Sequence, residues 1–479
     1  MNTPPEATPS PETLEKDRVP LTQKAAYASG AVASCYLTNT ISVLALPIYN
    51  IGLGVHPTTI SLAMGLPRFL DALTDPFIGN FSDNTRTRWG RRRPFIAIGL
   101  LVASLLFALM WLPPVGASVG VLGVYFTVIC TLTYIAISVW QIPWDALGME
   151  LSQDYDERTR VQAWKMTFYN VASFLTPWTY ALCLLPVFGG NEIVGVRYVG
   201  GGVAIVALLF GLTCAVFCRE RAETQKQERI KFLPAFVCTL KNRSFLILTG
   251  VLFIVLSGFL LSMPFMTYVN IYYVCGGDKA FGAKLSGLYG TVQAATGLIA
   301  VPFITWLATR YGKKAVMLGG QMVALLGCLS GLVLITPTHP YLQLIVPVLI
   351  ASGSTCVFLL WGSSLADVCD LDELQTGLRR EGMYGAVGAF TLKLGSAAVT
   401  SLSGIMLVAA GYAGSAAALT PEALVTMRNL YALVPATGLV VGLVLTAFYP
   451  ITEALSRSTR AQLERRREAA ALSSGGETV

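Results

Sequence analysis

Twelve apolar stretches divide the chain, and each is about 20 residues or longer, the length that an α-helix needs to cross a bilayer. Of the 479 residues, 54% are hydrophobic and only 13% are charged, whereas a soluble domain carries about 25% charged residues. We therefore predict an all-α integral membrane protein. The stretches cover residues 25–49, 58–81, 94–113, 117–147, 161–186, 197–218, 244–273, 283–309, 315–336, 341–367, 382–410 and 427–450.

The basic residues indicate how these stretches would be oriented. With twelve spans, both termini lie on the same side of the membrane. The two tails and the connections on that side carry 27 of the 34 Lys and Arg residues, whereas the opposite side carries four and the spans three. Because short cytoplasmic loops are enriched in Lys and Arg, we predict that both termini are cytoplasmic.

The sequence also repeats itself. Arg88-Trp89-Gly90-Arg91-Arg92 follows the second stretch, and Arg310-Tyr311-Gly312-Lys313-Lys314 follows the eighth, 222 residues later. Any cytoplasmic loop is rich in basic residues, but here an aromatic-Gly-basic-basic order recurs in register. We predict two pseudo-symmetric six-helix halves, with a substrate site between them. The predicted parts are a cytoplasmic tail (1–24), an N-terminal bundle (25–218), an inter-half loop (219–243), a C-terminal bundle (244–450) and a basic cytoplasmic tail (451–479).

Three charged residues stand within the second apolar stretch. Arg68, Asp71 and Asp75 are spaced 0, 3 and 7 residues apart, which places them within about 60° of arc on a helix. A charge at mid-bilayer costs about 2.5–3.5 kcal/mol, so this stripe should line a cavity or a polar interface. Two carboxylates one turn apart repel each other unless a positive charge lies between them. The spacing therefore favours a cation site, although an Arg68–Asp71 bridge between helices is an alternative.

Three segments resemble the glycoside–pentoside–hexuronide:cation symporters, a family of the major facilitator superfamily. They read PRFLDALTDPFIGNFSDNTRTRWG followed by RRRPF at 67–95, QIPWDALGMELSQDYDERTR at 141–160, and ADVCDLDE with GAFTLKLGS within 366–396. The resemblance covers both halves and implies the major facilitator fold. It also implies a coupling cation, Na⁺ or H⁺, no other metal and no cofactor.

By this resemblance, the cation site is formed by Asp71 and Asp75 with the hydroxyl of Ser138. The family's third acid aligns with Gln141, which retains an amide oxygen but no charge.

The same resemblance suggests which residues contact the substrate. Asp145 occupies the position of a sugar-stacking tryptophan in the family, and Trp140 and Trp144 on either side could take over that role or serve as membrane anchors. The other residues expected at the substrate site are the three cations within the spans, Arg68, Lys165 and Lys393. In the family, an acid of the first helix binds the hydroxyl groups of a galactoside, and Cys35 aligns with it here. Because a thiol does not accept hydrogen bonds from two hydroxyls as a carboxylate does, we expect a substrate other than a galactoside.

A second group of charges lies at the predicted cytoplasmic ends of the helices. Basic loops opposite acidic helix ends would close a gate in the outward-facing state and separate when the halves rock apart. The alternative is that these charges only keep the loops soluble and orient the protein in the membrane. That would explain the Lys and Arg residues but not the acids that recur beside them. The predicted gate residues are Asp83, Arg91, Arg92, Glu150, Arg158, Asp367, Asp370 and Arg379.

The leading hypothesis is therefore cation-coupled symport of a sugar or glycoside by a multi-pass protein of the inner cell membrane. We expect a monomer surrounded by lipid, with no nucleic-acid partner. A carrier of a lysolipid or other amphiphile is the alternative on the same scaffold, and a non-transporting receptor is an alternative of another class. A membrane enzyme is disfavoured because the spans hold no nucleophile–base or metal-ligand set.

Overall fold

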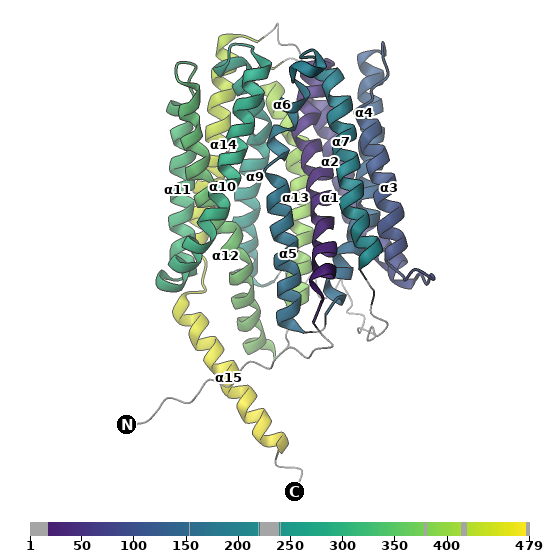
Figure 1. Ribbon diagram of the computed structural model, residues 1–479. Helices are drawn as coiled ribbons and strands as arrows, with labels where there is room; N and C mark the ends of the chain where they lie inside the picture. The colour runs from purple at the N-terminus through teal and green to yellow at the C-terminus, as the bar shows by residue number, and fades with distance from the viewer. Residues whose placement is uncertain are drawn as a thin grey trace.

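A computed structural model describes residues 18–152, 154–218, 220, 239, 241–377, 381–412 and 419–475. Within these residues the chain is a bundle of long helices that run roughly parallel to one axis (Figure 1). The first half contains α1 (Leu21–Ala45), α2 (Pro57–Asn84), α3 (Arg93–Met110), α4 (Val119–Glu150), α5 (Tyr155–Ser173), the short α6 (Thr179–Cys183) and α7 (Glu192–Phe217). The second contains α9 (Arg243–Tyr268), α10 (Lys279–Tyr311), α11 (Lys313–Leu334), α12 (Ile345–Thr376), α13 (Glu381–Ala409) and α14 (Pro421–Ala447), and α15 (Glu453–Gly475) follows.

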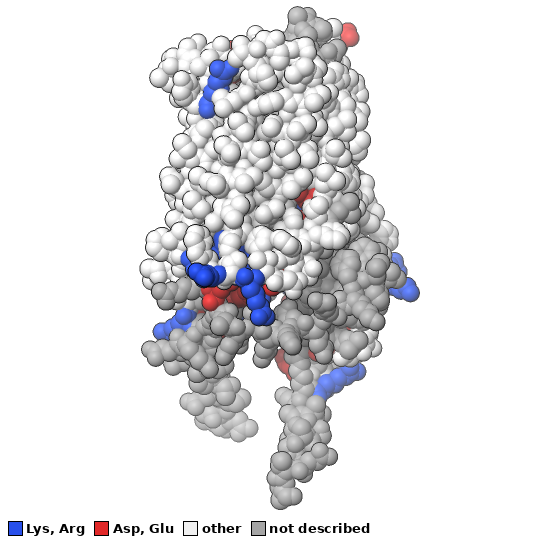
Figure 2. All heavy atoms as spheres, turned by 90° about the vertical axis from the view of Figure 1, so that its right-hand side faces the viewer, with Lys and Arg blue, Asp and Glu red and all other residues white. Residues whose placement is uncertain are grey.

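The prediction of an all-α membrane protein is confirmed. Ten helices of the described residues are long and apolar enough to cross a membrane. Two predicted spans are not among these ten: α2, which carries Arg68, Asp71 and Asp75, and the fifth span, which is broken near Pro177 into α5, a 3₁₀ turn (Thr176–Trp178) and α6. A space-filling view shows a broad belt with few charged side chains and a cluster of them below it (Figure 2).

Local sequence signals explain where several helices begin. Pro57 is the first residue of α2, where its missing N–H costs nothing. The side chains of Asn191, Asn242 and Asp278 accept hydrogen bonds from backbone N–H groups in the first turns of α7, α9 and α10. Because the polar groups of these first turns are satisfied by the chain itself, the helices can begin at the membrane boundary.

The first helix of each half ends in a π-helical segment, Leu46–Gly52 after α1 and Val269–Val274 after α9. These segments extend predicted spans 25–49 and 244–273. π-Helical turns are rare and frequently mark functional positions.

Both described ends of the chain lie at the same end of the bundle, where α1 begins and α15 runs outward (Figure 1). We call this end the termini face and the other end the opposite face. The helix α15 lies against α12, and α2 packs along α13, so α2 and α13 form the main contact between the two halves. The predicted inter-half loop 219–243 lies mostly outside the described residues.

Candidate functional site

Glycines allow α2 and α13 to approach closely. A Cβ atom built on Gly65 would lie 1.9 Å from the Ser401 hydroxyl oxygen, and one built on Gly404 would lie 2.1 Å from the Ser61 hydroxyl oxygen. The Ser61 hydroxyl also donates a hydrogen bond to the Ser401 carbonyl at 3.2 Å. Larger residues at either glycine would force the helices apart. This contact directs the charged stripe of α2 toward α13.

The two carboxylates of the stripe have different partners. Asp71 is buried and accepts a hydrogen bond from the Ser138 hydroxyl on α4 at 3.0 Å. Asp75 is ion-paired through Oδ2 with Lys393 on α13, across the interface between the halves. The other carboxylate oxygen of Asp75, Oδ1, is buried and has no hydrogen-bond partner among the described residues. Asp75 therefore offers a carboxylate oxygen that no other described residue binds, one helical turn from the carboxylate of Asp71.

Arg68 lies next to these acids without forming an ion pair within 4.0 Å to any acid of the described residues. Its guanidinium donates to the Thr400 hydroxyl at 3.3 Å and lies 3.5 Å from the Tyr134 hydroxyl, above the Tyr134 ring at 5.7 Å. The alternative of a direct Arg68–Asp71 bridge is therefore not what holds the helices here. Arg68 instead joins α2 to α4 and α13 and lines a cavity between the halves.

The remaining predicted site residues lie elsewhere on α4 and α5. Gln141 is half-buried, and none of the hydrogen bonds between described residues joins it to Asp71 or Asp75. Asp145 is ion-paired with Lys165 at 2.5 Å, within the first half. The structure therefore separates the predicted residues into an interface group around Asp71 and Asp75 and an α4–α5 pair.

The two tryptophans of α4 lie in the protein interior. Trp144 is 1% exposed, stacks on Tyr27 with 5.2 Å between ring centroids, and donates from Nε1 to the Tyr27 carbonyl at 3.0 Å. The Lys165 ammonium lies 4.5 Å above its ring. Trp140 is fully buried, and a Cβ on Gly99 would lie 2.9 Å from its backbone nitrogen. Neither ring lines the cavity described below, and their contact with substrate stays a prediction.

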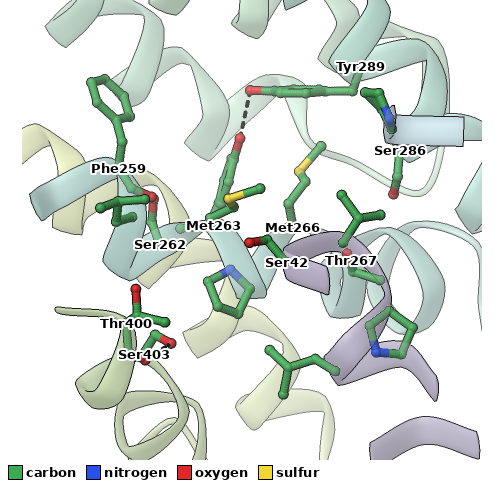
Figure 3. A pocket seen from close by; sticks show the side chains of 18 of the residues that line it. Ser42, Phe259, Ser262, Met263, Met266, Thr267, Ser286, Tyr289, Thr400 and Ser403 are labelled. Carbon is green, nitrogen blue, oxygen red and sulfur yellow. Dashed lines mark hydrogen bonds between the residues drawn. The ribbon is translucent and has the colours of Figure 1, made fainter. Parts of the chain in front are cut away.

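A cavity of about 350 Å³ lies between the halves beside Arg68 (Figure 3). Its walls combine hydroxyl groups with methionine, proline and aromatic side chains, and none of the lining residues is acidic. The lining residues come from several helices of both halves: Ser42, Val43, Leu46, Pro47, Ser61, Met64, Arg68, Pro177, Phe259, Leu260, Ser262, Met263, Pro264, Met266, Thr267, Ser286, Tyr289, Gly290, Gln293, Ile350, Thr400, Ser403, Tyr431 and Pro435.

Of these lining residues, only Arg68 is a predicted site residue. The strongest available signal was on α9, where Phe259, Ser262, Met263, Met266 and Thr267 recur every three or four residues, so that they share one helix face. Hydroxyl and thioether side chains are common in apolar spans, and the pattern cannot be distinguished from ordinary helix packing without a structure.

Contacts between the halves close the molecule at the opposite face. The Tyr268 hydroxyl donates to Asn50 Oδ1 at 2.7 Å, and Asn50 belongs to the π-helical segment after α1. The buried Glu192 at the start of α7 pairs with Lys279 at the start of α10 at 2.6 Å and accepts from the Tyr180 hydroxyl at 2.8 Å. We call the Glu192–Lys279 pair, together with the Tyr268–Asn50 bond, the opposite-face latch.

At the termini face, the predicted gate residues of the first half pair with one another. Arg92 lies 3.0 Å from Asp83 and 2.8 Å from Glu150, and Arg91 also pairs with Glu150. Arg158 donates from Nε to the carbonyl of Ser152 at 2.7 Å.

The second half has a similar group. Asp367 pairs with Lys313 at 2.5 Å and with Arg460 of α15 at 2.9 Å, and Arg460 lies 3.3 Å from Asp370. Arg379 lies outside the described residues. The ion pairs that join two described residues at this face stay within one half, whereas the opposite-face latch joins both halves. The described contacts thus correspond to a state closed at the opposite face.

Comparisons with known proteins agree with this architecture. A family model described as MFS/sugar transport protein matches residues 26–453. The chain is 29% identical to the uncharacterized symporter YnaJ of Bacillus subtilis, covering 94% of this chain and 96% of the relative. It is 25% identical to the glucuronide carrier protein homolog of Escherichia coli, covering 92% and 95%. The sodium-dependent lysophosphatidylcholine symporter 1 of Gallus gallus is also 25% identical, over 95% and 91%.

Solved structures show the same fold. A structure reported for proton-dependent oligopeptide transporters superposes with a TM-score of 0.64 at 13% identity, covering 91% of this chain and 99% of the other. The apolar helices indicate a multi-pass membrane protein, and the family match and the similar proteins are transporters of the symporter type rather than enzymes. The chain belongs to the MFS/sugar transport protein family of the major facilitator superfamily.

Proposed function

We propose that this protein couples the uptake of a sugar or glycoside to the inward movement of Na⁺ or H⁺. The observation that carries the proposal is the environment of Asp75: one carboxylate oxygen is paired with Lys393, and the other is buried with no partner in the described part of the chain. A buried acceptor that is left unpaired costs about 1–3 kcal/mol, more for a charged group, so a bound cation at this position would relieve that cost.

The neighbouring groups suit a small cation. Asp71 and Asp75 are one helical turn apart on α2, and the Ser138 hydroxyl is bonded to Asp71 at 3.0 Å. Carboxylate and hydroxyl oxygens are the ligands that hard cations prefer. A cation bound to Asp75 would weaken the attraction between that carboxylate and Lys393. Because this pair joins α2 to α13, cation binding would thereby alter the contact between the two halves, which is the coupling that a symporter needs.

The cavity beside Arg68 supports a hydroxyl-bearing substrate. Ser42, Ser262, Ser286 and Thr267 offer both donors and acceptors, as does the amide of Gln293. Sugar hydroxyls can both donate and accept hydrogen bonds, so they can pair with such side chains. Relatives of this chain include proteins named as a glucuronide carrier homolog and an isoprimeverose transporter, which favours a glycoside.

A second candidate substrate is a lysolipid or another amphiphile. Phe259, Leu260, Met263 and Met266 give the cavity an apolar wall, and methionine side chains adapt to flexible apolar groups. A relative 25% identical to this chain is named as a sodium-dependent lysophosphatidylcholine symporter, so the same fold is compatible with this substrate class.

The proposed setting is the inner cell membrane, with the termini face in the cytoplasm. The support is the distribution of Lys and Arg, since 27 of 34 lie in the tails and connections at that end. In this orientation the opposite-face latch closes the external entrance. We propose a monomer, because both halves and the cavity between them come from one chain.

The test is uptake by purified protein in liposomes. Radiolabelled glucuronide, an isoprimeverose-type disaccharide and lysophosphatidylcholine would be offered under an inward Na⁺ gradient, an inward H⁺ gradient, or neither. We expect gradient-dependent uptake of a glycoside, and its loss in Asp75→Asn but not in the control Glu464→Gln, which alters an exposed acid of α15. Gradient-dependent uptake of the lysolipid alone would establish the second candidate. Binding without uptake under every gradient would establish a receptor and overturn the transporter.

A further inference from the structure

The two halves carry a similar turn at the termini face, and beside each turn lies a glutamate that neither the cavity nor the cation site uses. The repeated turn contains Gly90 in the first half and Gly312 in the second, both with positive φ angles of 105° and 83°. In each half a glutamate from the segment after the sixth helix reaches this glycine. A Cβ built on Gly90 would lie 2.6 Å from Glu220 Oε1, and one built on Gly312 would lie 2.6 Å from Glu453 Oε2.

In the first half, the Glu220 carboxylate caps the start of α3. It accepts hydrogen bonds from three successive backbone N–H groups, those of Arg91 at 2.8 Å and of Arg92 and Arg93 at 2.9 Å each. The first N–H groups of a helix have no partner within the helix, and an anion there also interacts favourably with the helix dipole. Side chains at Gly90 would displace the carboxylate, which explains the need for glycine.

In each half, a basic residue in the repeated turn or directly after it binds the end of the sixth helix of that half. Arg93 donates from Nε to the Ala215 carbonyl at 2.6 Å and from a terminal nitrogen to the Val216 carbonyl at 2.8 Å. In the second half, the Lys314 ammonium donates to the carbonyls of Ala447 at 2.9 Å and Tyr449 at 2.8 Å. Cations at a helix C-terminus satisfy carbonyl groups that have no partner within the helix.

The neighbouring basic residue of each turn binds the end of the fourth helix. Arg91 pairs with Glu150 at the end of α4, and Lys313, at the matching position of the second half, reaches Asp367 near the end of α12 at 2.5 Å. In both halves, therefore, the turn between the second and third helices is joined to the fourth and sixth helices. Figure 1 shows the ends of α3 and α7 beside each other at this face.

We infer that Glu220 is a positioning residue for the rocking step: it holds the basic turn of the first half so that this half moves as one rigid body. Glu453 lies beside the matching turn of the second half, at Gly312, and we assign it the same role. The cavity and the Asp71–Asp75 group lie on other parts of the helices, so these glutamates would affect the rate of conversion between states rather than the affinity for substrate. The two glutamates differ in how firmly they are held. Glu220 has three backbone donors, whereas Glu453 is 39% exposed and shares its charge with Arg457.

Hydrogen exchange tests the placement without any knowledge of the substrate. Glutamine at position 220 keeps the shape of the side chain but has one acceptor oxygen and no charge. In the full-length protein in lipid nanodiscs, Glu220→Gln should raise the exchange rate of the Arg91–Arg93 amides about tenfold or more. The exposed control Glu464→Gln should leave them unchanged. Unchanged exchange at these amides in Glu220→Gln would overturn the inference, whatever the transport data show.

Transport kinetics test the role, and this arm rests on the proposed function. With whichever substrate the uptake panel identifies, Glu220→Gln should lower Vmax about tenfold with KM changed less than twofold, and Glu453→Gln should lower Vmax by a smaller factor. Gly90→Ala provides a second route, because its Cβ displaces the Glu220 carboxylate, and it should reproduce the fall in Vmax. A rise in KM at constant Vmax, or wild-type kinetics in both Glu220→Gln and Gly90→Ala, would contradict the positioning role.

Discussion

Lys393 on α13 is ion-paired with Asp75 on α2, so a tethered ammonium group occupies part of the proposed cation site in this state. The pair crosses the interface between the halves, and its side chains are only partly exposed. A coupling cation and Lys393 would therefore compete for the same carboxylate. The strength of that competition would set how readily α2 and α13 separate.

Removal of the Asp75 charge should uncouple transport. In Asp75→Asn, the Lys393 ammonium loses its counter-ion and the cation loses a charged ligand. Hydrogen bonds to charged groups are worth about 1.5–3 kcal/mol, so we expect gradient-driven uptake to fall about tenfold or more. The measurement is initial uptake with and without the cation gradient in proteoliposomes. Gradient-driven uptake at the wild-type rate would show that Asp75 does not bind the coupling cation.

Replacement of Ser138 should lower the affinity of the same site for the cation, with a smaller effect than replacement of Asp75. Ser138→Ala removes the hydroxyl that donates to Asp71 at 3.0 Å, and with it a proposed cation ligand. We expect the cation concentration for half-maximal uptake to rise about threefold to tenfold, corresponding to about 0.7–1.4 kcal/mol, with Vmax little changed. Thr127→Val on the same helix is the matched control, because the Thr127 hydroxyl bonds only to the Gly123 carbonyl among the contacts of the described residues. Equal cation dependence in both variants would argue against Ser138 as a ligand.

The sequence predicts the candidate site best where charged residues lie in an apolar segment. The stripe of Arg68, Asp71 and Asp75 had to be removed from lipid, and the structure places it at the α2–α13 interface beside Lys393. The family and fold were also predicted from motifs in both halves, and both predictions are confirmed. The energetic cost of a buried charge is large enough to be read from sequence alone.

The sequence is less informative about features that depend on how the helices pack against one another. The Trp144 ring is enclosed because Gly30 leaves room for it, and Gly99 lets α3 lie against the backbone of α4 at Trp140. No property of the tryptophans themselves indicates this. The cavity wall of α9 consists of residues that are ordinary in a membrane helix. Glu220 was also missed, since its partners are backbone N–H groups more than 120 residues away in the sequence.

The buried contact at the start of α5 should contribute to stability. Glu157 is 1% exposed and binds the Lys24 ammonium at 2.6 Å, the Val19 N–H at 3.0 Å and the Arg160 guanidinium at 3.2 Å. Loss of one partner from a buried ion pair costs about 3–5 kcal/mol, and a glutamine that keeps one acceptor should recover part of it. We expect Glu157→Gln to lower the thermal unfolding midpoint of the purified protein. Glu422→Gln, at an exposed acid of α14, is the control. Equal midpoints in the two variants would show that the Glu157 contacts add nothing to stability.

Weakening of the opposite-face latch should shift the protein toward the state that is open at that face. The Glu192–Lys279 pair joins α7 to α10 at 2.6 Å, and Glu192 is 9% exposed while Lys279 is 36% exposed. Because Lys279 retains contact with solvent, we assign the pair about 1–2 kcal/mol, which corresponds to a 5- to 30-fold change in the ratio of the two states.

The change in that ratio can be measured with a thiol reporter in the cavity. Ser42→Cys lines the cavity and should react slowly with a membrane-impermeant maleimide added from the opposite face while the latch is closed. Adding Glu192→Gln should accelerate labelling from that side about fivefold or more, whereas adding Glu422→Gln should not. The reporter is introduced into a background in which the other reactive cysteines are replaced. Equal labelling rates with and without Glu192→Gln would show that the ion pair does not hold the entrance closed, and that the Tyr268–Asn50 bond and the α2–α13 contact suffice.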